Sequence, residues 1–140
     1  MPMIDVYAPD DLLPSDSDRP LGEQLTLAIL RAEGVTSPAP FHLDNTAAFI
    51  HRMAAPALQT AARANARAVR VQIITPPGAL TRNGQKQLVD DVTRIVADVC
   101  GDPSQKQRTW VLLTEAAEGG WGINGTAYGR EEFAALARRK

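Results

Sequence analysis

The feature of this sequence that most limits its fold is a repeat of about half the chain. Shifting the 140 residues by 67 positions places Pro9 on Pro76 and Gly34 on Gly101. In each half a strand-like segment is followed by a loop, an amphipathic segment that ends at one of these glycines, and a second strand-like segment. The repeat predicts one domain over residues 1–140, built from two β-α-β units that cover about 2–68 and 69–140.

Alternation of apolar and polar residues locates four strands. The predicted strands are Pro2–Ala8, Thr46–Met53, Val69–Thr75 and Thr109–Glu115. Parallel strands in one unit need a right-handed crossover, which a helix supplies. We therefore expect an α/β (α+β) fold in which a four-stranded sheet carries two helices on one face. The opposite face would be apolar and exposed, which favours an oligomer.

Three segments have helical spacing of apolar residues. One begins at Leu21 and ends before Gly34, a second follows Thr81 as its N-cap and ends at Gly101, and a short one covers Arg130–Arg139. We expect residues 10–20 and 37–45 to be irregular. Residues 54–68 fit either a helical turn or an ordered connection, since Pro56 interrupts an alanine-rich run.

Composition and charge exclude several classes of function. The chain has 15 Lys and Arg against 16 Asp and Glu, so neither a nucleic-acid nor a membrane partner is expected. No apolar run is long enough to cross a bilayer and the first residues do not resemble a leader, which predicts a cytoplasmic protein. Cys100 is the single cysteine and there are two histidines, so we expect no metal site. After these exclusions, a small-molecule substrate remains the expected partner.

The stretch GGWGINGTAYG, residues 119–129, contains the spacing G-x-G-x-x-G that binds dinucleotides. That function needs a helix opening on the third glycine, a second strand and an acidic residue about 20 positions later. Only 15 residues follow Gly125, so no second strand fits. We interpret the stretch as a glycine-rich turn or hairpin at an oligomer interface.

The N-terminus offers a different chemistry. Removal of Met1 would leave Pro2 with a free secondary amine, and burial or a nearby cation would bring such an amine into the range of a general base at neutral pH. If Met1 stays, the Pro2 nitrogen is an amide without basicity. The alternative is that Met-Pro only begins an edge strand.

Met1-Pro2-Met3-Ile4, the two β-α-β units and the segment TEAAEGGWGING after the last strand together resemble the tautomerase superfamily, whose simplest member is 4-oxalocrotonate tautomerase. The resemblance is strongest from Val69 to about Arg139 and weakest from Ser37 to Ala68. It implies a homotrimer of fused chains and a cofactor-independent isomerase. Because the second unit begins with Val69 instead of proline, it implies one active site per chain, with Pro2 as the catalytic residue.

The resemblance also assigns substrate-binding positions. Trp121 takes the place of the hairpin aromatic residue that lines the pocket. The positions of the family's carboxylate-binding arginines are occupied by Pro76–Ala79 and Trp110. Because a carboxylate needs charged donors, we expect Arg70 and Arg108 to replace them, with Arg82 and Arg52 as further candidates. Asn124 is the preferred polar helper; Tyr128, His51 and His42 are others.

These observations predict keto-enol proton transfer by Pro2, acting as general base and acid, on a small unsaturated or 2-oxo acid substrate. Two alternatives stay open. The same amine could serve a hydratase, dehalogenase or decarboxylase, although the last two depend on the missing arginines. The chain could also be a catalytically weak trimeric scaffold.

Overall fold

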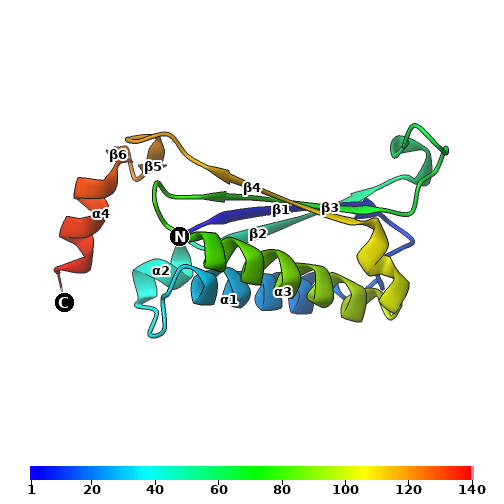
Figure 1. The fold of residues 1–140 in the computed structure, drawn as a ribbon, viewed down its shortest axis with the longest axis horizontal. Coiled ribbons are helices and arrows are strands. Elements are labelled where there is room, and N and C mark those ends of the chain that lie inside the picture. The colour runs from blue at the N-terminus through cyan, green and yellow to red at the C-terminus, as the bar shows by residue number, and fades with distance from the viewer. Residues whose placement is uncertain (140) are drawn as a thin grey trace.

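The computed structural model describes residues 1–139, and Lys140, which belongs to the predicted solvated end of the last helix, lies outside them. Both halves of the chain contribute two strands to one sheet of order β2-β1-β3-β4 (Figure 1). These strands are β1 (Met3–Pro9), β2 (Ala47–Met53), β3 (Val69–Thr75) and β4 (Thr109–Glu115). Strand β1 runs parallel to β2, β3 runs parallel to β4, and β1 and β3 pair in antiparallel orientation. The predicted four-stranded sheet is confirmed.

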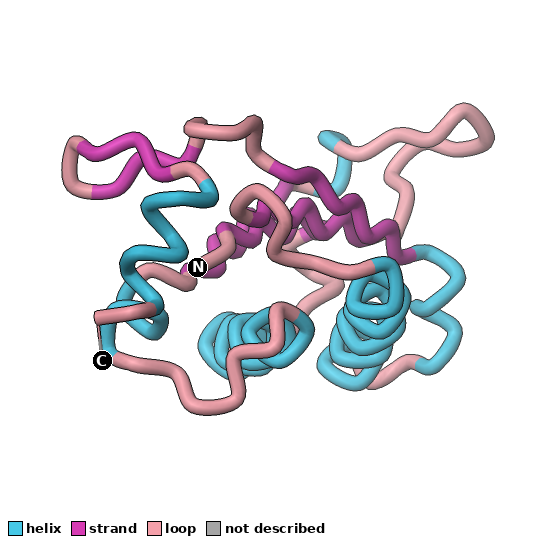
Figure 2. The backbone as a smooth tube through the Cα atoms, turned by 60° about the vertical axis from the view of Figure 1, so that its left-hand side comes forward, coloured by secondary structure: helices cyan, strands magenta, loops and turns pink. Residues whose placement is uncertain are grey.

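Two long helices, α1 (Asp18–Ala32) and α3 (Arg82–Cys100), lie side by side on one face of this sheet (Figure 2). The core forms between these layers. In β3, for example, Val69, Val71 and Ile73 are fully buried and the residues between them are not. Their alternation is what predicted the strand, because successive side chains of a strand point to opposite faces.

The ends of α3 agree with the sequence prediction. The hydroxyl of Thr81 accepts a hydrogen bond from the Gly84 amide at 3.0 Å, which caps the first turn. Gly101 has φ 68°, a left-handed conformation that glycine adopts without steric cost, and it ends the helix.

The structure corrects two expectations in the loops and helix ends, and it describes residues 54–68, for which the sequence left two possibilities open. Helix α1 begins at Asp18, before Leu21, because Pro20 is tolerated in a first turn, where amides need no intrahelical partner. A short helix α2 (Pro40–Asp44) forms in the stretch expected to be irregular, with Pro at its start. Residues 54–68 hold only the 3₁₀ turn η1 (Ala55–Ala57) as a regular element.

A second 3₁₀ segment, η2 (Pro103–Arg108), leads from α3 into β4. After β4 the chain forms an arm: strands β5 (Trp121–Ile123) and β6 (Thr126–Tyr128) pair as a hairpin, and α4 (Arg130–Ala137) follows. Two residues connect the strands, Asn124 with φ 50° and Gly125 with φ 77°, as in a type I′ turn. The predicted hairpin is confirmed. Helix α4 ends two residues earlier than predicted and lies beside the N-terminus (Figure 2).

Candidate active site at the N-terminus

A pocket of about 220 Å³ surrounds the first residue of the chain. Four parts of the fold form its walls: the N-terminus, the segment from the end of α1 to α2, the loop after β3, and α4. Most of the lining is apolar. The lining residues are Met1, Glu33, Val35, His42, Pro76, Pro77, Ala79, Phe133, Leu136 and Ala137.

The N-terminus is held there by strand pairing. The carbonyl of Pro2 accepts a hydrogen bond from the Ala47 amide at 3.2 Å, which extends the ladder between β1 and β2. Strand β1 has a neighbouring strand on each side, and Pro2, directly before it, is buried. Opposite them, Pro76 and Pro77 follow β3 and supply apolar wall without an amide donor.

A buried ion pair lies at the base of this pocket. The Met1 amino group donates a hydrogen bond to Oε2 of Glu33 at 3.1 Å, and the two side chains are only 4% and 5% exposed. Burial raises the pKa of the Glu33 carboxyl, and the adjacent amino group opposes part of that rise. The second oxygen, Oε1, has no hydrogen-bond partner among the described residues. Sequence reasoning missed Glu33, because one carboxylate after a helix end forms no recognisable motif.

The loop after β3 is fixed by charged residues from the end of β4 and from the C-terminal arm. The Gly78 amide donates to Oε1 of Glu115 at 2.5 Å. The guanidinium group of Arg130 lies over Gly78, so that a Cβ there would stand 3.3 Å from its Nε. Arg130 is itself paired with Glu118 at 3.6 Å and is 70% exposed. Sequence analysis did not single out Arg130, which the arm brings to the edge of the pocket.

The residues proposed from sequence for substrate binding do not gather around Pro2 in this chain. Trp121 is 6% exposed and does not line the pocket. Asn124 is exposed at the hairpin turn, where its left-handed backbone gives it a structural role. Arg70 lies on the open face of the sheet, with its guanidinium carbon 4.7 Å from the ring centre of Tyr7. Their roles toward substrate stay predictions.

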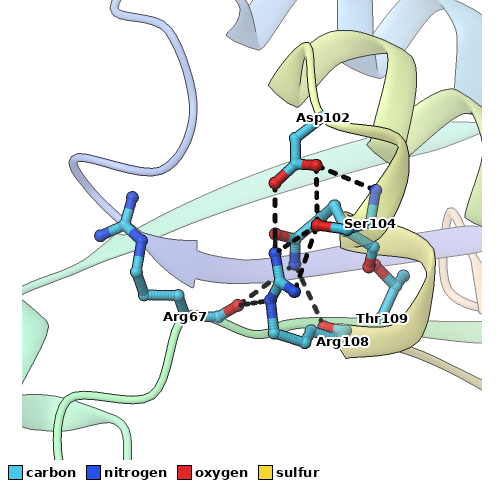
Figure 3. A network of polar contacts seen from close by, with 6 residues as sticks. Arg67, Asp102, Ser104, Arg108 and Thr109 are labelled. Carbon is cyan, nitrogen blue, oxygen red and sulfur yellow. Dashed lines mark hydrogen bonds and ion pairs between the residues drawn. The ribbon is translucent and has the colours of Figure 1, made fainter.

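Arg108 lies in η2, beside the start of β3, and takes part in a polar network (Figure 3). Its Nε donates to the Arg67 carbonyl at 3.2 Å, and Nη2 pairs with Asp102 at 3.3 Å. The fully buried Gln105 donates to the same carbonyl at 3.3 Å. These bonds tie the segment before β3 to the segment before β4, so Arg108 holds the junction between the two halves.

Of the remaining candidate residues from the sequence, most contact other parts of the fold and one lines the pocket. Arg52 binds the loop between β1 and α1, and Arg82 binds Gln85 within α3. His51 pairs with Asp5 at 2.6 Å, and Tyr128 lies in β6. His42 alone among these lines the pocket, where burial lowers its pKa and the N-terminal charge adds to the effect.

Solved structures of known proteins share this architecture. A fused 4-OT symmetric trimer superimposes with a TM-score of 0.76 at 17% identity, over 95% of this chain and 98% of the other. A member of the cis-3-chloroacrylic acid dehalogenase family gives 0.73 at 20% identity, over 99% and 92%. A macrophage migration inhibitory factor-like protein from Entamoeba histolytica gives 0.70 at 12% identity, over 91% and 98%. At these identities the likeness shows the fold.

Fold and pocket define a protein of two fused β-α-β units whose N-terminus is enclosed by the loop after the third strand. Residues 69–130 match the family described as Tautomerase enzyme. This match supports the predicted resemblance to the tautomerase superfamily over the second unit, and the solved structures share the fold over nearly the whole chain. No curated protein sequence matches the chain. In the part that the structure describes, no helix is long and apolar enough to span a membrane.

Proposed function

We propose that the protein is a cofactor-independent tautomerase in which Pro2, freed by removal of Met1, moves a proton between carbon and oxygen of a small enol or carbonyl compound. The observation that carries this proposal is the position of the N-terminus, buried at the head of β1 in a largely apolar pocket. The match of residues 69–130 to the family described as Tautomerase enzyme supports the same reaction class. We expect the enzyme in the cytoplasm.

The secondary amine of a free N-terminal proline suits this chemistry. An amine that gains and loses a proton near neutral pH serves as base in one half of the reaction and as acid in the other. Pro76, Pro77 and Phe133 give the pocket an apolar lining. Electrostatic contacts are stronger in apolar surroundings than in water.

We further propose that a single domain of two fused units assembles as a homotrimer through the open face of its sheet. Four large apolar side chains on that face are 37% to 51% exposed: Phe49, Ile74, Trp110 and Leu112. A face with this composition favours contact with another chain. One of the structural relatives is described as a symmetric trimer. On this proposal the predicted roles of Trp121, Arg70, Arg108 and Asn124 depend on contacts between chains.

A second candidate is another reaction of the same amine. The relative from the cis-3-chloroacrylic acid dehalogenase family supports a hydratase or dehalogenase. Against dehalogenation and decarboxylation, the loop at Pro76–Ala79 lacks the family's arginines. The same loop favours the third possibility, a catalytically weak scaffold.

The decisive experiment compares ketonisation of phenylpyruvate and 2-hydroxymuconate by the wild-type protein and Pro2→Ala, after intact mass has shown whether Met1 is absent. We expect Pro2→Ala to lose at least about 100-fold in kcat/KM. Pro14→Ala, in the exposed loop after β1, is the matched control. Equal rates for wild type and Pro2→Ala would refute the proline mechanism. Retained Met1 without activity would favour the scaffold.

A further inference from the structure

The base of the N-terminal pocket contains a carboxyl group that the proline mechanism does not use. Glu33 lines the pocket with a side chain 5% exposed, and only Oε2 has a hydrogen-bond partner, the terminal amine. Among the described residues Oε1 is both buried and unpaired. A buried carboxyl oxygen without a partner is costly. Such a group at a pocket wall is suited to hydrogen bonding with a bound molecule.

The second observation is the balance of charge around this pocket. Of its lining residues within 1–139, none is lysine or arginine. Arg130, which lies over Gly78, is paired with Glu118, and Glu115 accepts a hydrogen bond from the Gly78 amide. The ionisable groups of the described lining are therefore the terminal amine, His42 and Glu33.

The third observation is the distance between the Glu33 carboxyl and the terminal nitrogen after Met1 has been removed. Removal of Met1 transfers the terminal nitrogen to Pro2, at most one residue's length away, roughly 3.6 Å. Because Glu33 lies 3.1 Å from the present amino nitrogen, its carboxyl stays within about 7 Å of the new one. The buried Met1 side chain would leave its space to a ligand between the two groups.

We propose that Glu33 is a second catalytic residue of this pocket, giving a proton to the carbonyl oxygen of the substrate while the Pro2 amine takes one from the adjacent carbon, and that the substrate is an uncharged carbonyl compound. This inference rests on the proposed function of Pro2. The inference goes beyond that function because it names both the general acid and the class of substrate.

The proton balance of this reaction is closed. The Pro2 amine breaks the carbon–hydrogen bond next to the carbonyl and becomes an ammonium ion. The Glu33 carboxyl gives its proton to the carbonyl oxygen and becomes a carboxylate, so the ketone leaves as its enol. Transfer of one proton from the ammonium to the carboxylate then restores both groups. Burial raises the pKa of the Glu33 carboxyl and so favours the protonated form from which this step starts.

The uncharged substrate follows from the same geometry. When Glu33 has given up its proton it is a carboxylate, and a substrate carboxylate would then lie next to it in a site of low dielectric, where like charges repel strongly. The lining offers it no guanidinium or ammonium group of a side chain. A ketone, an aldehyde or an ester instead offers an oxygen that accepts the Glu33 proton and apolar carbon for the proline and phenylalanine walls.

The test uses two substrates with the same reacting carbons but different charge, phenylpyruvate and its methyl ester, with the full-length processed protein and with each rate corrected for uncatalysed exchange. Exchange of the proton next to the ketone is followed by proton NMR in deuterated water. The variants are Glu33→Gln, which keeps the shape but not the acid, and Glu23→Gln, the same change at a 60% exposed site on α1. Circular dichroism shows that each variant is folded.

We expect the wild type to turn over the ester at least about 10-fold faster than the acid in kcat/KM. Glu33→Gln should lose roughly 100-fold on the ester, within the range for general acid catalysis, and its preference for ester over acid should narrow because no carboxylate forms beside the substrate in that variant. Glu23→Gln should match wild type. An ester rate unchanged in Glu33→Gln, or a wild-type preference for the acid, overturns the inference.

Pro2→Ala on the ester separates the two proposals. Loss of exchange in Pro2→Ala with full exchange in Glu33→Gln would remove Glu33 and leave the proline mechanism intact. Full exchange in Pro2→Ala would remove the proline mechanism itself.

Discussion

Arg52 joins the end of β2 to the loop between β1 and α1, and we predict that it stabilises the fold without binding substrate. Its side chain is 18% exposed. Nη1 donates to the carbonyls of Asp10 at 2.8 Å and Leu13 at 3.0 Å, and Nε donates to Asp18 at 2.9 Å. The guanidinium therefore satisfies backbone carbonyls that the loop itself does not pair.

The expected loss in free energy of unfolding follows from these contacts. A hydrogen bond to a charged group contributes about 1.5–3 kcal/mol when buried and an exposed ion pair at most about 1 kcal/mol. Because the contacts share one side chain and water can replace part of them, we expect Arg52→Ala to cost about 3 kcal/mol in free energy of unfolding. For a 140-residue chain the specific unfolding entropy converts this to a fall in Tm of about 10 °C.

The assay is thermal unfolding by circular dichroism at one fixed protein concentration, with Arg94→Ala as the control. Arg94 also forms two ion pairs, but it is 50% exposed on α3, so its removal should leave the Tm nearly unchanged. The Tm of Arg52→Lys should lie between those of the wild type and Arg52→Ala, because lysine keeps the charge but not the forked donors. If Arg52→Ala and Arg94→Ala have the same Tm, or if Arg52→Ala changes KM but not Tm, the reasoning is wrong.

Three further predictions concern assembly, the hairpin and pH. Leu112→Asp on the open sheet face should convert the proposed trimer to monomers in light scattering, whereas Leu27→Asp on the outer face of α1 should not. Gly125→Ala should cost about 1 kcal/mol at φ 77° and increase amide exchange in the hairpin, while Gly122→Ala, where a Cβ meets open space, should change little. Because burial raises the folded-state pKa of Glu33, the folded protein holds its proton more tightly; the free energy of unfolding should fall as pH rises above 4.5 and through that raised pKa, and the fall should be absent in Glu33→Gln.

Local sequence signals predict most of the fold. The alternation of β3, the Thr81 cap and Gly101 each act within a few residues, so the sequence shows both the elements and their ends. The two-residue turn at Asn124 and Gly125 also has such a signal, since Asn-Gly favours type I′ hairpins. Helix α2 escaped prediction because its five residues include no buried residue and leave no hydrophobic period to recognise.

The candidate site is less predictable for a physical reason. Met1, Glu33, Pro76 and Phe133 are separated by long stretches of sequence, and only the pairing of β1 with β3 and the return of the arm bring them together. The sequence indicates Pro2 through the chemistry of its nitrogen and the resemblance to a family. It contains no corresponding signal for Glu33, whose importance arises from burial.

The network around Arg108 and Gln105 has a consequence for how the two halves can diverge. Beside the start of β3, where the repeat places the counterpart of the N-terminus, the Arg67 carbonyl is bound by both side chains. In this chain that position is an internal joint whose carbonyl needs hydrogen-bond donors. A substitution of Arg108 or Gln105 would disturb the connection between the two halves, whereas a substitution of Met1 would change the pocket. The two positions that the repeat makes equivalent are thus under different physical constraints.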